Sequence, residues 1–398
     1  MNVTIEPSAP GGTVPAPPSK SMAHRLLICA GLAIGEKTVH GVACSEDILA
    51  TMDCLRALGV KCEARGGDVV VSGYTPHCGA AGAVLPCRES GSTLRFFLPL
   101  CLFGPPMTLT GSRRLLARPL DVYRELCETQ GIRFEQGETS VLVQGTLSPG
   151  EFRMPGDVSS QFVSGLLFAL PGLPGDSVIR LRRPVVSRSY IDMTMDALRM
   201  FGVETRWLDR ETIDIPGRQY CAFRPDVTVE GDWSNAAPFL ALGVDVTGLD
   251  RESRQGDRVF PAYLGALDAG RPTLDLTDCP DLGPLLMACA AARHGAVLTG
   301  TRRLRWKESD RSWAMYEELR KFGADVHIGE DTITVERMLH PPTGPLSGHG
   351  DHRIVMALAV LCTQTGGTIA GAEAVSKSFP DFFEKLQRAG VRLTPDRA

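Results

Sequence analysis

The sequence predicts an α+β protein with two domains. The chain has 398 residues, and at ~150 residues per domain this length favours two to three domains. A second observation is a recurring pattern: an amphipathic helix end, a glycine, a short strand, a turn and a second strand. The pattern recurs six times at a period of roughly 70 residues, which is longer than a solenoid repeat and typical of a larger α+β unit. Six units indicate two domains of three units each.

The glycine of each copy has a physical role, because a helix ends well on a residue that tolerates a left-handed conformation. A clear copy reads "LRKFGADVHIGEDTITVE", and weaker copies are "LGALDAGRPTLDLTD" and the truncated "LQRAGVRLTP". The strands alternate apolar and polar residues, which predicts sheets with one buried face. Helix–glycine–strand order also occurs in other α/β proteins, so the regular spacing carries the argument. The six glycines are Gly59, Gly131, Gly202, Gly270, Gly323 and Gly390.

Composition limits the classes of function. Hydrophobic residues make up 43% and charged residues 22% of the chain, as in soluble globular proteins. The net charge of −4 argues against nucleic-acid binding, which needs a basic face. No secretory signal is visible at the start, and the apolar run 96–103 is too short for a membrane span. We therefore expect a cytoplasmic protein that binds neither nucleic acid nor membrane and holds anions through local Lys and Arg clusters.

The cysteines predict no metal site. The chain has 12 cysteines without a CxxC pair or a Cys/His ligand spacing. Buried, reduced thiols are the expectation for such a pattern in a cytosolic protein.

Three predicted helix starts combine hydroxyls, glycines and cations: "PPSKSMAHR", "ESGSTLRF" and "GDVSSQF". Free backbone N–H groups and the positive end of the helix dipole make such a start an anion site. Simple capping by serine explains each one equally well. Lys20 is different, because a cation in the first helical turn opposes the dipole. We expect a negative group beside it.

The stretch "RWKESDRS" precedes an apolar-periodic segment. A helix over residues 306–323 would place Lys307 and Arg311 on one face, with Glu308 beside them. This arrangement would make an anion site with one proton-transfer group, while Asp310 would serve as a helix cap or an arginine partner. A solvated surface helix accounts for the same pattern. Other clusters that ion pairs or caps could explain contain Arg113, Arg114, Arg118, Ser187, Arg188, Tyr190, Asp281, Asp351, His352, Arg353 and Lys377.

In this order, the motifs resemble the 5-enolpyruvylshikimate-3-phosphate synthase family of enolpyruvyl transferases, from about residue 3 to residue 390. The resemblance implies two domains, each of three βαβαββ units with pseudo-threefold symmetry, and an active site in the interdomain cleft. One domain would comprise residues 1–19 and 226–398, and residues 20–225 would form the inserted one. The motifs are "PPSKSMAHR", "ESGSTLRF", "LTGSRRLLARPL", "GDVSSQF", "VVSRSYID", "VEGDWSNAAPFL", "DCPD", "RWKESDR", "GDHR" and "SKSFPDFF".

The same resemblance implies an enzyme, a 3-phosphoshikimate 1-carboxyvinyltransferase. It would transfer the enolpyruvyl group of phosphoenolpyruvate to the 5-hydroxyl of shikimate 3-phosphate and release phosphate. This reaction belongs to the shikimate pathway of aromatic amino-acid biosynthesis and needs no metal or organic cofactor. We expect a monomer whose partners are these two small molecules.

The family's functional residues map onto this sequence by motif. Asp281 would accept the proton of the 5-hydroxyl, Glu308 would protonate the methylene carbon of phosphoenolpyruvate, and Lys20 would assist catalysis. The residues implied for shikimate 3-phosphate are Lys20, Ser21, Arg25, Ser159, Ser160, Gln161, Ser187, Tyr190, Asp281 and Lys307. Those implied for phosphoenolpyruvate are Lys20, Gly91, Arg118, Gln161, Arg311, Arg353 and Lys377. Bidentate Arg forks and compact Lys charges suit phosphate and carboxylate groups.

Some positions depart from the commonest family pattern. Where many members read Asn-Ala-Gly-Thr, this chain has "ESGS" from Glu89, and Arg303 replaces a usual Asn. His349 and Gly350 replace a usual Tyr-Asn before "DHR".

Two alternatives remain open on the sequence. One is the homologous UDP-N-acetylglucosamine 1-carboxyvinyltransferase, most of which carry a reactive Cys in the loop that corresponds to "TGSRRLLARP". This chain has no Cys between Cys101 and Cys127, which favours the shikimate enzyme. The other is a non-catalytic anion-binding protein of the same fold, although both the acid and the base are present.

Overall fold

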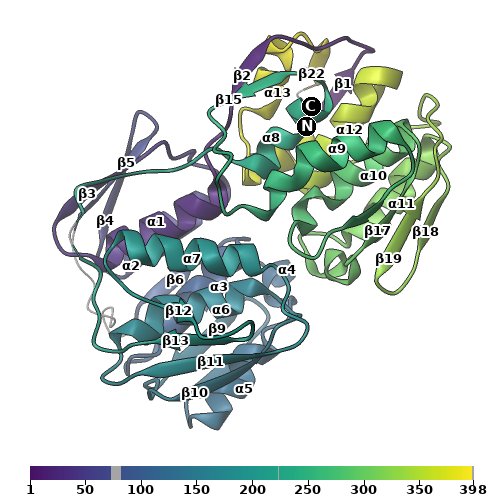
Figure 1. Cartoon of the computed structure of the whole chain (residues 1–398). Coiled ribbons are helices and arrows are strands. Elements are labelled where there is room, and N and C mark those ends of the chain that lie inside the picture. The colour runs from purple at the N-terminus through teal and green to yellow at the C-terminus, as the bar shows by residue number, and fades with distance from the viewer. Residues whose placement is uncertain (73–81, 223, 397–398) are drawn as a thin grey trace. The chain divides into compact units, whose positions relative to one another are not determined.

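The structure, a computed structural model, describes residues 1–72, 82–222 and 224–396. It shows an α+β protein whose chain divides into two compact units (Figure 1). Unit 1 comprises Met1–Pro17 and Gly231–Ala398, and unit 2 comprises Pro18–Glu230. Unit 2 is therefore an insertion into unit 1.

The described part of unit 2 contains three four-stranded sheets that share one topology. In each sheet the first strand is parallel to the second, and a hairpin adds two antiparallel strands. The first sheet, of order β14-β3-β5-β4, comprises β14 (Asp226–Thr228), β3 (Glu36–His40), β5 (Asp68–Ser72) and β4 (Lys61–Arg65). The second comprises β6 (Val84–Pro86), β7 (Met107–Thr110), β9 (Ser140–Gln144) and β8 (Arg133–Gln136). The third comprises β10 (Glu151–Pro155), β11 (Ser177–Arg182), β13 (Thr212–Ile215) and β12 (Arg206–Trp207).

The helices of unit 2 are interspersed among these strands along the chain. Their bounds are α1 (Lys20–Leu32), α2 (Glu46–Ala57), α3 (Gly91–Leu100), α4 (Arg113–Leu116), α5 (Asp121–Thr129), α6 (Ser160–Ala169) and α7 (Arg188–Met200).

Unit 1 repeats the topology in two four-stranded sheets. One has β16 (Thr273–Asp275), β17 (Ala296–Thr299), β19 (Thr332–Val335) and β18 (Val326–Ile328) in that order. The other has β20 (Leu346–Ser347), β21 (Gly367–Ala370), β1 (Asn2–Ile5) and β22 (Leu393–Asp396). The helices are α8 (Trp233–Ala241), α9 (Phe260–Ala269), α10 (Gly283–Ala292), α11 (Arg311–Lys321), α12 (His352–Thr365) and α13 (Phe382–Arg388).

The two weaker copies of the sequence pattern differ from the expected helix–hairpin form. After Gly270 the chain enters β16, which is the first strand of the next unit and pairs in parallel with β17. The repeat whose helix ends at Gly270 therefore has no hairpin of its own. Within the described residues, it retains only the parallel pair β2 (Thr13–Pro15) and β15 (Asp245–Thr247). Gly270 is extended at φ 163°, whereas Gly59 and Gly323 are left-handed at φ 90° and 85°. In the truncated copy at Gly390, the N-terminal strand β1 supplies the missing hairpin partner.

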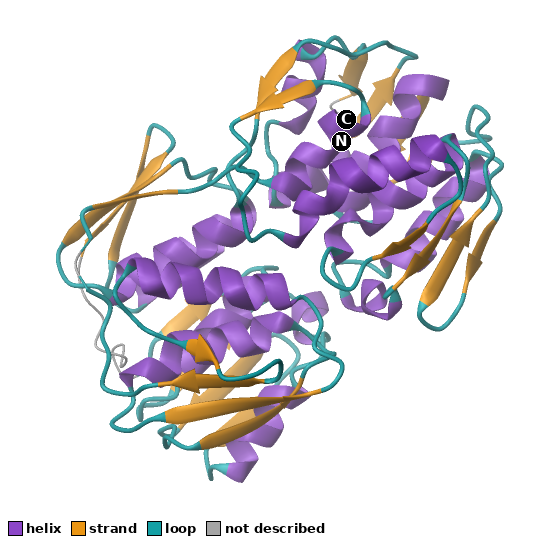
Figure 2. Cartoon of the chain, in the orientation of Figure 1, coloured by secondary structure: helices purple, strands orange, loops and turns teal. Residues whose placement is uncertain are grey.

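Each unit contains two kinds of helix. The helices α1, α3, α6, α8, α10 and α12 are buried along almost their whole length, as expected for helices that are apolar all round. The helices α2, α5, α7 and α11 are amphipathic. Figure 2 shows helices gathered inside each unit, with the sheets around them. The N-terminal turns are therefore the main polar parts of the buried helices, and most candidate site residues lie there.

The described cysteines are free thiols, and all but Cys44 are buried, as the sequence predicted. Cys78 lies outside the described residues. No helix in the described ranges has the length and apolarity needed to cross a membrane.

Candidate active site

In unit 2, serine side chains cap the three buried helices. Ser19, Ser90 and Ser159 accept hydrogen bonds from the backbone N–H groups of Met22, Thr93 and Gln161, at 3.3, 3.2 and 3.3 Å. Each of the predicted helix starts is thus a true, capped N-terminus. Capping uses one backbone donor per helix, and the positive end of each helix dipole remains.

Lys20 has a negative neighbour, as its position opposing the helix dipole predicted. Its Nζ lies 2.6 Å from Oδ2 of Asp47, and both side chains are largely buried. Sequence reasoning did not identify Asp47, because an acidic residue in the first turn of α2 is an ordinary helix signal. The ion pair links the N-terminal turns of α1 and α2 and holds the Lys20 ammonium in place.

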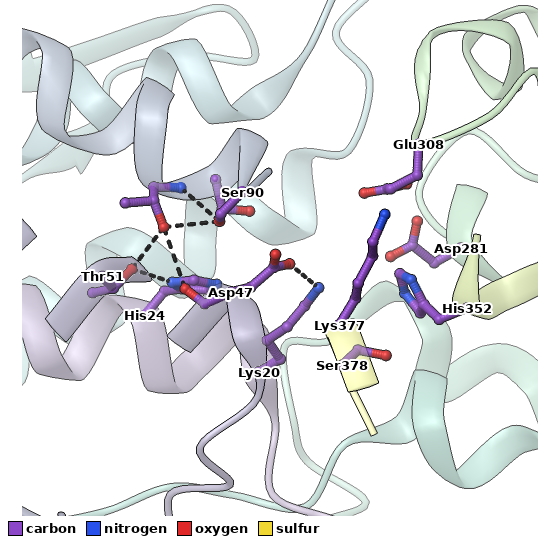
Figure 3. A network of polar contacts seen from close by, with 12 residues as sticks. Lys20, His24, Asp47, Thr51, Ser90, Asp281, Glu308, His352, Lys377 and Ser378 are labelled. Atoms are coloured by element: carbon purple, nitrogen blue, oxygen red, sulfur yellow. Dashed lines mark hydrogen bonds and ion pairs between the residues drawn. The ribbon is translucent and has the colours of Figure 1, made fainter. Parts of the chain in front are cut away.

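A chain of hydroxyls continues from this pair into α3 (Figure 3). Nδ1 of His24 lies 2.7 Å from Oγ1 of Thr51, which lies 2.9 Å from Oγ1 of Thr93. Thr93 donates to Oγ of Ser90 at 2.8 Å. Burial, together with the charges of Lys20 and Arg25, lowers the pKa of His24 well below its usual value. His24 is therefore neutral, and the network fixes the three helix starts relative to one another.

Arg25 is 2% exposed and bonds to protein oxygens. It donates to Oγ1 of Thr194 at 2.8 Å and to the backbone carbonyls of Tyr190 and Ser21 at 2.9 and 2.5 Å. Burial lowers the pKa of Arg25 to about 10, so the side chain remains a cation at neutral pH. Arg25 thereby joins two other predicted site residues, Ser21 and Tyr190, through their main chains. Ser187, which is also buried, precedes α7 in a left-handed conformation at φ 50°.

Three residues predicted for phosphoenolpyruvate meet at the start of α3. A Cβ on Gly91 would lie 2.5 Å from Nη1 of Arg118 and 3.0 Å from Nη1 of Arg95. Arg95 donates to Oε1 of Gln161 at 2.7 Å, and the amide of Gln161 donates to Ser92 at 2.9 Å. Gly91 thus leaves room for the close approach of two guanidinium groups, and a larger residue would displace the Arg118 guanidinium. Arg95, which sequence reasoning did not assign, is part of the cluster.

In unit 1, the stretch from Arg305 to Ser312 does not form the predicted helix over 306–323. A short 3-10 helix covers Arg302–Trp306, and α11 begins only at Arg311. Asp310 accepts a hydrogen bond from the N–H of Trp313 at 3.1 Å, which confirms its predicted role as a helix cap. Lys307 and Glu308 precede this cap, so the argument that Lys307 and Arg311 share a helical face was wrong.

Lys307 and Arg311 nevertheless meet at Asp281. Nζ of Lys307 and Nη1 of Arg311 lie 3.0 and 2.8 Å from Oδ1 of Asp281, and Nη2 of Arg353 lies 3.6 Å from Oδ2. Asp281 is not the helix cap that its position before an apolar helix suggested, because it lies in a 3-10 turn before α10. Burial acts to raise the pKa of Asp281, but the three cations outweigh it and hold the pKa well below its usual value.

Arg311 is 1% exposed and pairs with three carboxylates. Besides Asp281, its Nη2 lies 2.7 Å from Oε2 of Glu308, and its Nε lies 2.8 Å from Oδ2 of Asp351. Burial opposes the charge, yet these carboxylates raise the pKa of Arg311 well above its usual value. Asp351 is itself fully buried and also accepts from the N–H of Arg353 at 2.9 Å, which caps α12.

Two further contacts complete this cluster. Arg353 donates to Oδ1 of Asn235 at 3.0 Å, and Lys377 donates to the carbonyl of Gly350 at 3.0 Å. Asn235 was not assigned from the sequence, although a buried amide in the apolar helix α8 was a usable signal. Figure 3 shows the side chains of Lys377 and Glu308 reaching toward Asp281. The structure thus gathers the sequence-predicted residues of unit 1 into one charged cluster.

The departures from the family pattern lie beside these groups. Glu89 is exposed, directly before the Ser90 cap of α3. Arg303 is buried and donates to the carbonyl of Thr277 at 2.6 Å. Within the described residues, no group of three His, Cys, Asp or Glu side chains could hold a metal ion.

Comparison with known proteins agrees with the sequence motifs and the fold. The family model described as EPSP synthase (3-phosphoshikimate 1-carboxyvinyltransferase) matches residues 6–270 and 269–386. A 3-phosphoshikimate 1-carboxyvinyltransferase from Clostridium kluyveri is 39% identical over 98% of both chains, and one from Clostridium novyi is 36% identical over 98% of this chain and 97% of its own. An EPSP synthase structure from Acinetobacter baumannii superimposes with a TM-score of 0.80 at 25% identity, covering 99% of this chain and 100% of that one. The chain therefore belongs to the EPSP synthase family.

Proposed function

We propose that this protein transfers the enolpyruvyl group of phosphoenolpyruvate to the 5-hydroxyl of shikimate 3-phosphate and releases phosphate. The observation that carries the proposal is the arrangement around Arg311. An ionised Asp281 lies among three cations, and Glu308 is held by the same guanidinium. The site thus offers a carboxylate that can accept a proton, a second carboxyl group for the opposite transfer, and charges that bind anionic substrates.

In the proposed reaction, Asp281 takes the proton of the 5-hydroxyl as that oxygen attacks C2 of phosphoenolpyruvate. The lowered pKa of Asp281 keeps it ionised at neutral pH and makes it a weak base. It can accept the proton only as the new C–O bond forms and the hydroxyl becomes acidic. Lys307 donates to Oδ1 of Asp281 and so fixes the direction of the Asp281 carboxylate. Lys307 would also contact the ring of shikimate 3-phosphate.

Glu308, which takes up a proton once its pair with Arg311 is exchanged, would supply that proton to the methylene carbon, which makes C2 electrophilic and leads to a tetrahedral intermediate. Glu308, again a carboxylate, then removes a proton from the resulting methyl group as the bond from C2 to the phosphate oxygen breaks, which restores the double bond. The proton that Asp281 took from the hydroxyl leaves with the phosphate. Lys20, held by Asp47, would stabilise charge on the leaving phosphate. These steps are proton transfers and anion stabilisation, which protein side chains can perform.

Arg311 suggests how substrate binding is coupled to this chemistry. Its guanidinium nitrogens are taken by Asp281, Glu308 and Asp351, so a phosphoenolpyruvate carboxylate must replace one of them. We infer that it replaces Glu308, because Asp281 is also held by Lys307 and Asp351 also caps α12. The exchange would free Glu308 for proton transfer when its substrate is bound.

Other cations would complete the phosphoenolpyruvate site. Nε of Arg118 and of Arg353 is buried without a hydrogen-bond partner among the described residues, and such donors suit an anionic ligand. We assign phosphoenolpyruvate to Lys20, Gly91, Arg118, Gln161, Arg311, Arg353 and Lys377.

Shikimate 3-phosphate would bind through hydroxyls, helix starts and cations. Arg25 would act mainly by fixing the main chains of Ser21 and Tyr190. The full proposed set is Lys20, Ser21, Arg25, Ser159, Ser160, Gln161, Ser187, Tyr190, Asp281 and Lys307.

The function is tested by phosphate release with each substrate alone and with both together. We expect release only when shikimate 3-phosphate and phosphoenolpyruvate are both present. Release with UDP-N-acetylglucosamine in place of shikimate 3-phosphate would support the nucleotide-sugar transferase instead. Ligand binding without turnover would indicate a non-catalytic anion-binding protein. We further propose that the enzyme is cytoplasmic and monomeric. Light scattering under the same conditions would test the proposal of a monomer.

A further inference from the structure

The loop that precedes α12 contains two consecutive left-handed residues. His349 has φ 49° and Gly350 has φ 63°. Glycine adopts this conformation freely, whereas a residue with a side chain does so at a cost and needs its surroundings to hold it there. The position of His349 in such a loop, two residues before Asp351, calls for an anchor.

The anchor is Glu318 on α11. Nε2 of His349 lies 2.8 Å from Oε1 of Glu318, whose side chain is 1% exposed. Glu318 also accepts from Nζ of Lys321, at 3.0 and 2.9 Å, and from the N–H of Ser347 at 3.0 Å. Burial acts to raise the pKa of Glu318, but the bonds from His349, Lys321 and Ser347 lower it below its usual value. The carboxylate is therefore a fixed, ionised point on a helix.

The loop fixed by this anchor carries two groups of the charged cluster. The carbonyl of Gly350 accepts from Nζ of Lys377 at 3.0 Å. The carboxylate of Asp351 accepts from Nε of Arg311 at 2.8 Å. The backbone N–H of Asp351 donates to the carbonyl of Gly348 at 2.9 Å. A change in the backbone dihedral angles of His349 and Gly350 would move the supports of both cations.

We propose that His349 is a positioning residue for the phosphoenolpyruvate site. Its ring, bonded to Glu318, holds loop 348–351 so that Gly350 directs Lys377 and Asp351 directs Arg311. His349 acts through these cations and does not touch substrate. The inference rests on the proposed function, because that function assigns Lys377 and Arg311 to phosphoenolpyruvate.

The substitution His349→Gly separates the ring from the backbone. Glycine keeps the left-handed conformation, so the substitution removes the ring, with its bond to Glu318 and its longer pair with Glu317, and allows the backbone to stay as it is. We expect the KM for phosphoenolpyruvate to rise by about tenfold, as for the loss of one hydrogen bond to a charged group. The KM for shikimate 3-phosphate and kcat should stay within about threefold of wild type.

A conservative variant and a matched control accompany this test. His349→Gln retains an N–H donor that can reach Glu318, so it should recover most of the affinity for phosphoenolpyruvate. His327 lies in strand β18 and forms an exposed pair with Asp325, at 3.2 Å between Nε2 and Oδ2. His327→Gln should leave both KM values unchanged.

The outcomes distinguish this inference from the proposed function. Wild-type turnover with both substrates is measured first, and its absence would contradict the function and the inference together. With turnover established, an unchanged KM for phosphoenolpyruvate in His349→Gly overturns the role of His349 alone. An equal rise in both KM values with a lower melting temperature would show general loss of structure, which also overturns it.

Discussion

Arg311 shows how one side chain can serve both structure and binding. A buried charge is strongly destabilising unless it is paired and hydrogen-bonded, and the planar guanidinium offers five donors in a fixed fork. Three carboxylates from three different segments satisfy this requirement. The same property makes the guanidinium a ready partner for a substrate carboxylate, since exchanging one anion for another leaves the buried charge paired.

Glu308→Gln tests the proposed acid. Glutamine can keep a hydrogen bond to Arg311 but cannot transfer a proton, so turnover should fall by ~10²–10⁴-fold, the usual contribution of general acid–base catalysis. Binding of shikimate 3-phosphate should change only a few-fold, as titration calorimetry can measure. Asp310→Asn is the matched control, since asparagine also caps helices well and turnover should persist. Near-normal phosphate release by Glu308→Gln would rule out its assigned role.

Gly91→Ala tests the close approach at the start of α3. The added methyl group would lie 2.5 Å from Nη1 of Arg118, so that guanidinium must move. Because small displacements of binding groups can cost up to ~10²-fold, we expect the KM for phosphoenolpyruvate to rise by on the order of tenfold. Steady-state kinetics with shikimate 3-phosphate saturating would measure it. An unaltered KM would show that Arg118 does not bind this substrate.

The residue scale also shows what sequence could predict about the site. Neighbouring residues such as Lys307, Glu308 and Arg311 were found together because their chemistry is local. Asp281, which pairs with Lys307 and Arg311, and Asp351, which pairs with Arg311, lie 30 and 40 residues from Arg311, and only the packing of α10, α11 and α12 brings them to it. The pairing of Lys20 with Asp47 and of Arg353 with Asn235 could not be predicted either, because these residues lie far apart in the sequence.

At the scale of elements, glycine-terminated helices were the most reliable signal. Hairpins follow Gly59, Gly131, Gly202 and Gly323 as predicted. After Gly270 the prediction of a repeat with its own hairpin was wrong, because a short strand does not reveal whether it pairs backward or opens the next sheet. The helix predicted over 306–323 begins only at Arg311, because Asp310 caps α11 and the residues before Asp310 turn toward Asp281.

Gly265→Ala tests helix propensity in helix α9. Gly265 is exposed in the middle of the helix, and a Cβ there would have no heavy atom within 4 Å. Alanine should therefore stabilise the protein by about 0.5–1 kcal/mol through helix propensity and reduced freedom of the unfolded chain. Urea unfolding would measure the gain, and activity should not change. A loss of stability would indicate that this face of α9 is packed against something.

At the scale of the whole molecule, the largely buried carboxylates whose pKa values are lowered are unevenly distributed. Three carboxylates of this kind belong to unit 1: Asp281, Asp351 and Glu318. In unit 2 the described acids with lowered pKa values, such as Asp68 and Glu151, are exposed or half-exposed, where solvent screening makes such pairs weak.

This distribution predicts that acid destabilises unit 1 first. A carboxylate whose pKa is lowered by folding stabilises the folded state above its unfolded pKa, ~3.9 for Asp. That stability is lost as the pH falls toward the lowered folded values. We expect amides of α12 to lose protection from hydrogen exchange before those of α6 as the pH decreases below about 4. Exchange followed by mass spectrometry, corrected for intrinsic rates, would show this order. Simultaneous loss, or earlier loss in α6, would contradict it.

The pairing of β1 with β21 and β22 has a consequence for synthesis on the ribosome. Asn2 faces Ala370 and Asp396 across the sheet, so β1 emerges long before the two strands with which it pairs. Unit 2 emerges completely in the meantime and can fold as a domain while translation continues. During that interval β1 is an unpaired strand, exposed to wrong partners. Its short length and the polar residues Asn2 and Thr4 limit the risk of aggregation of the nascent chain.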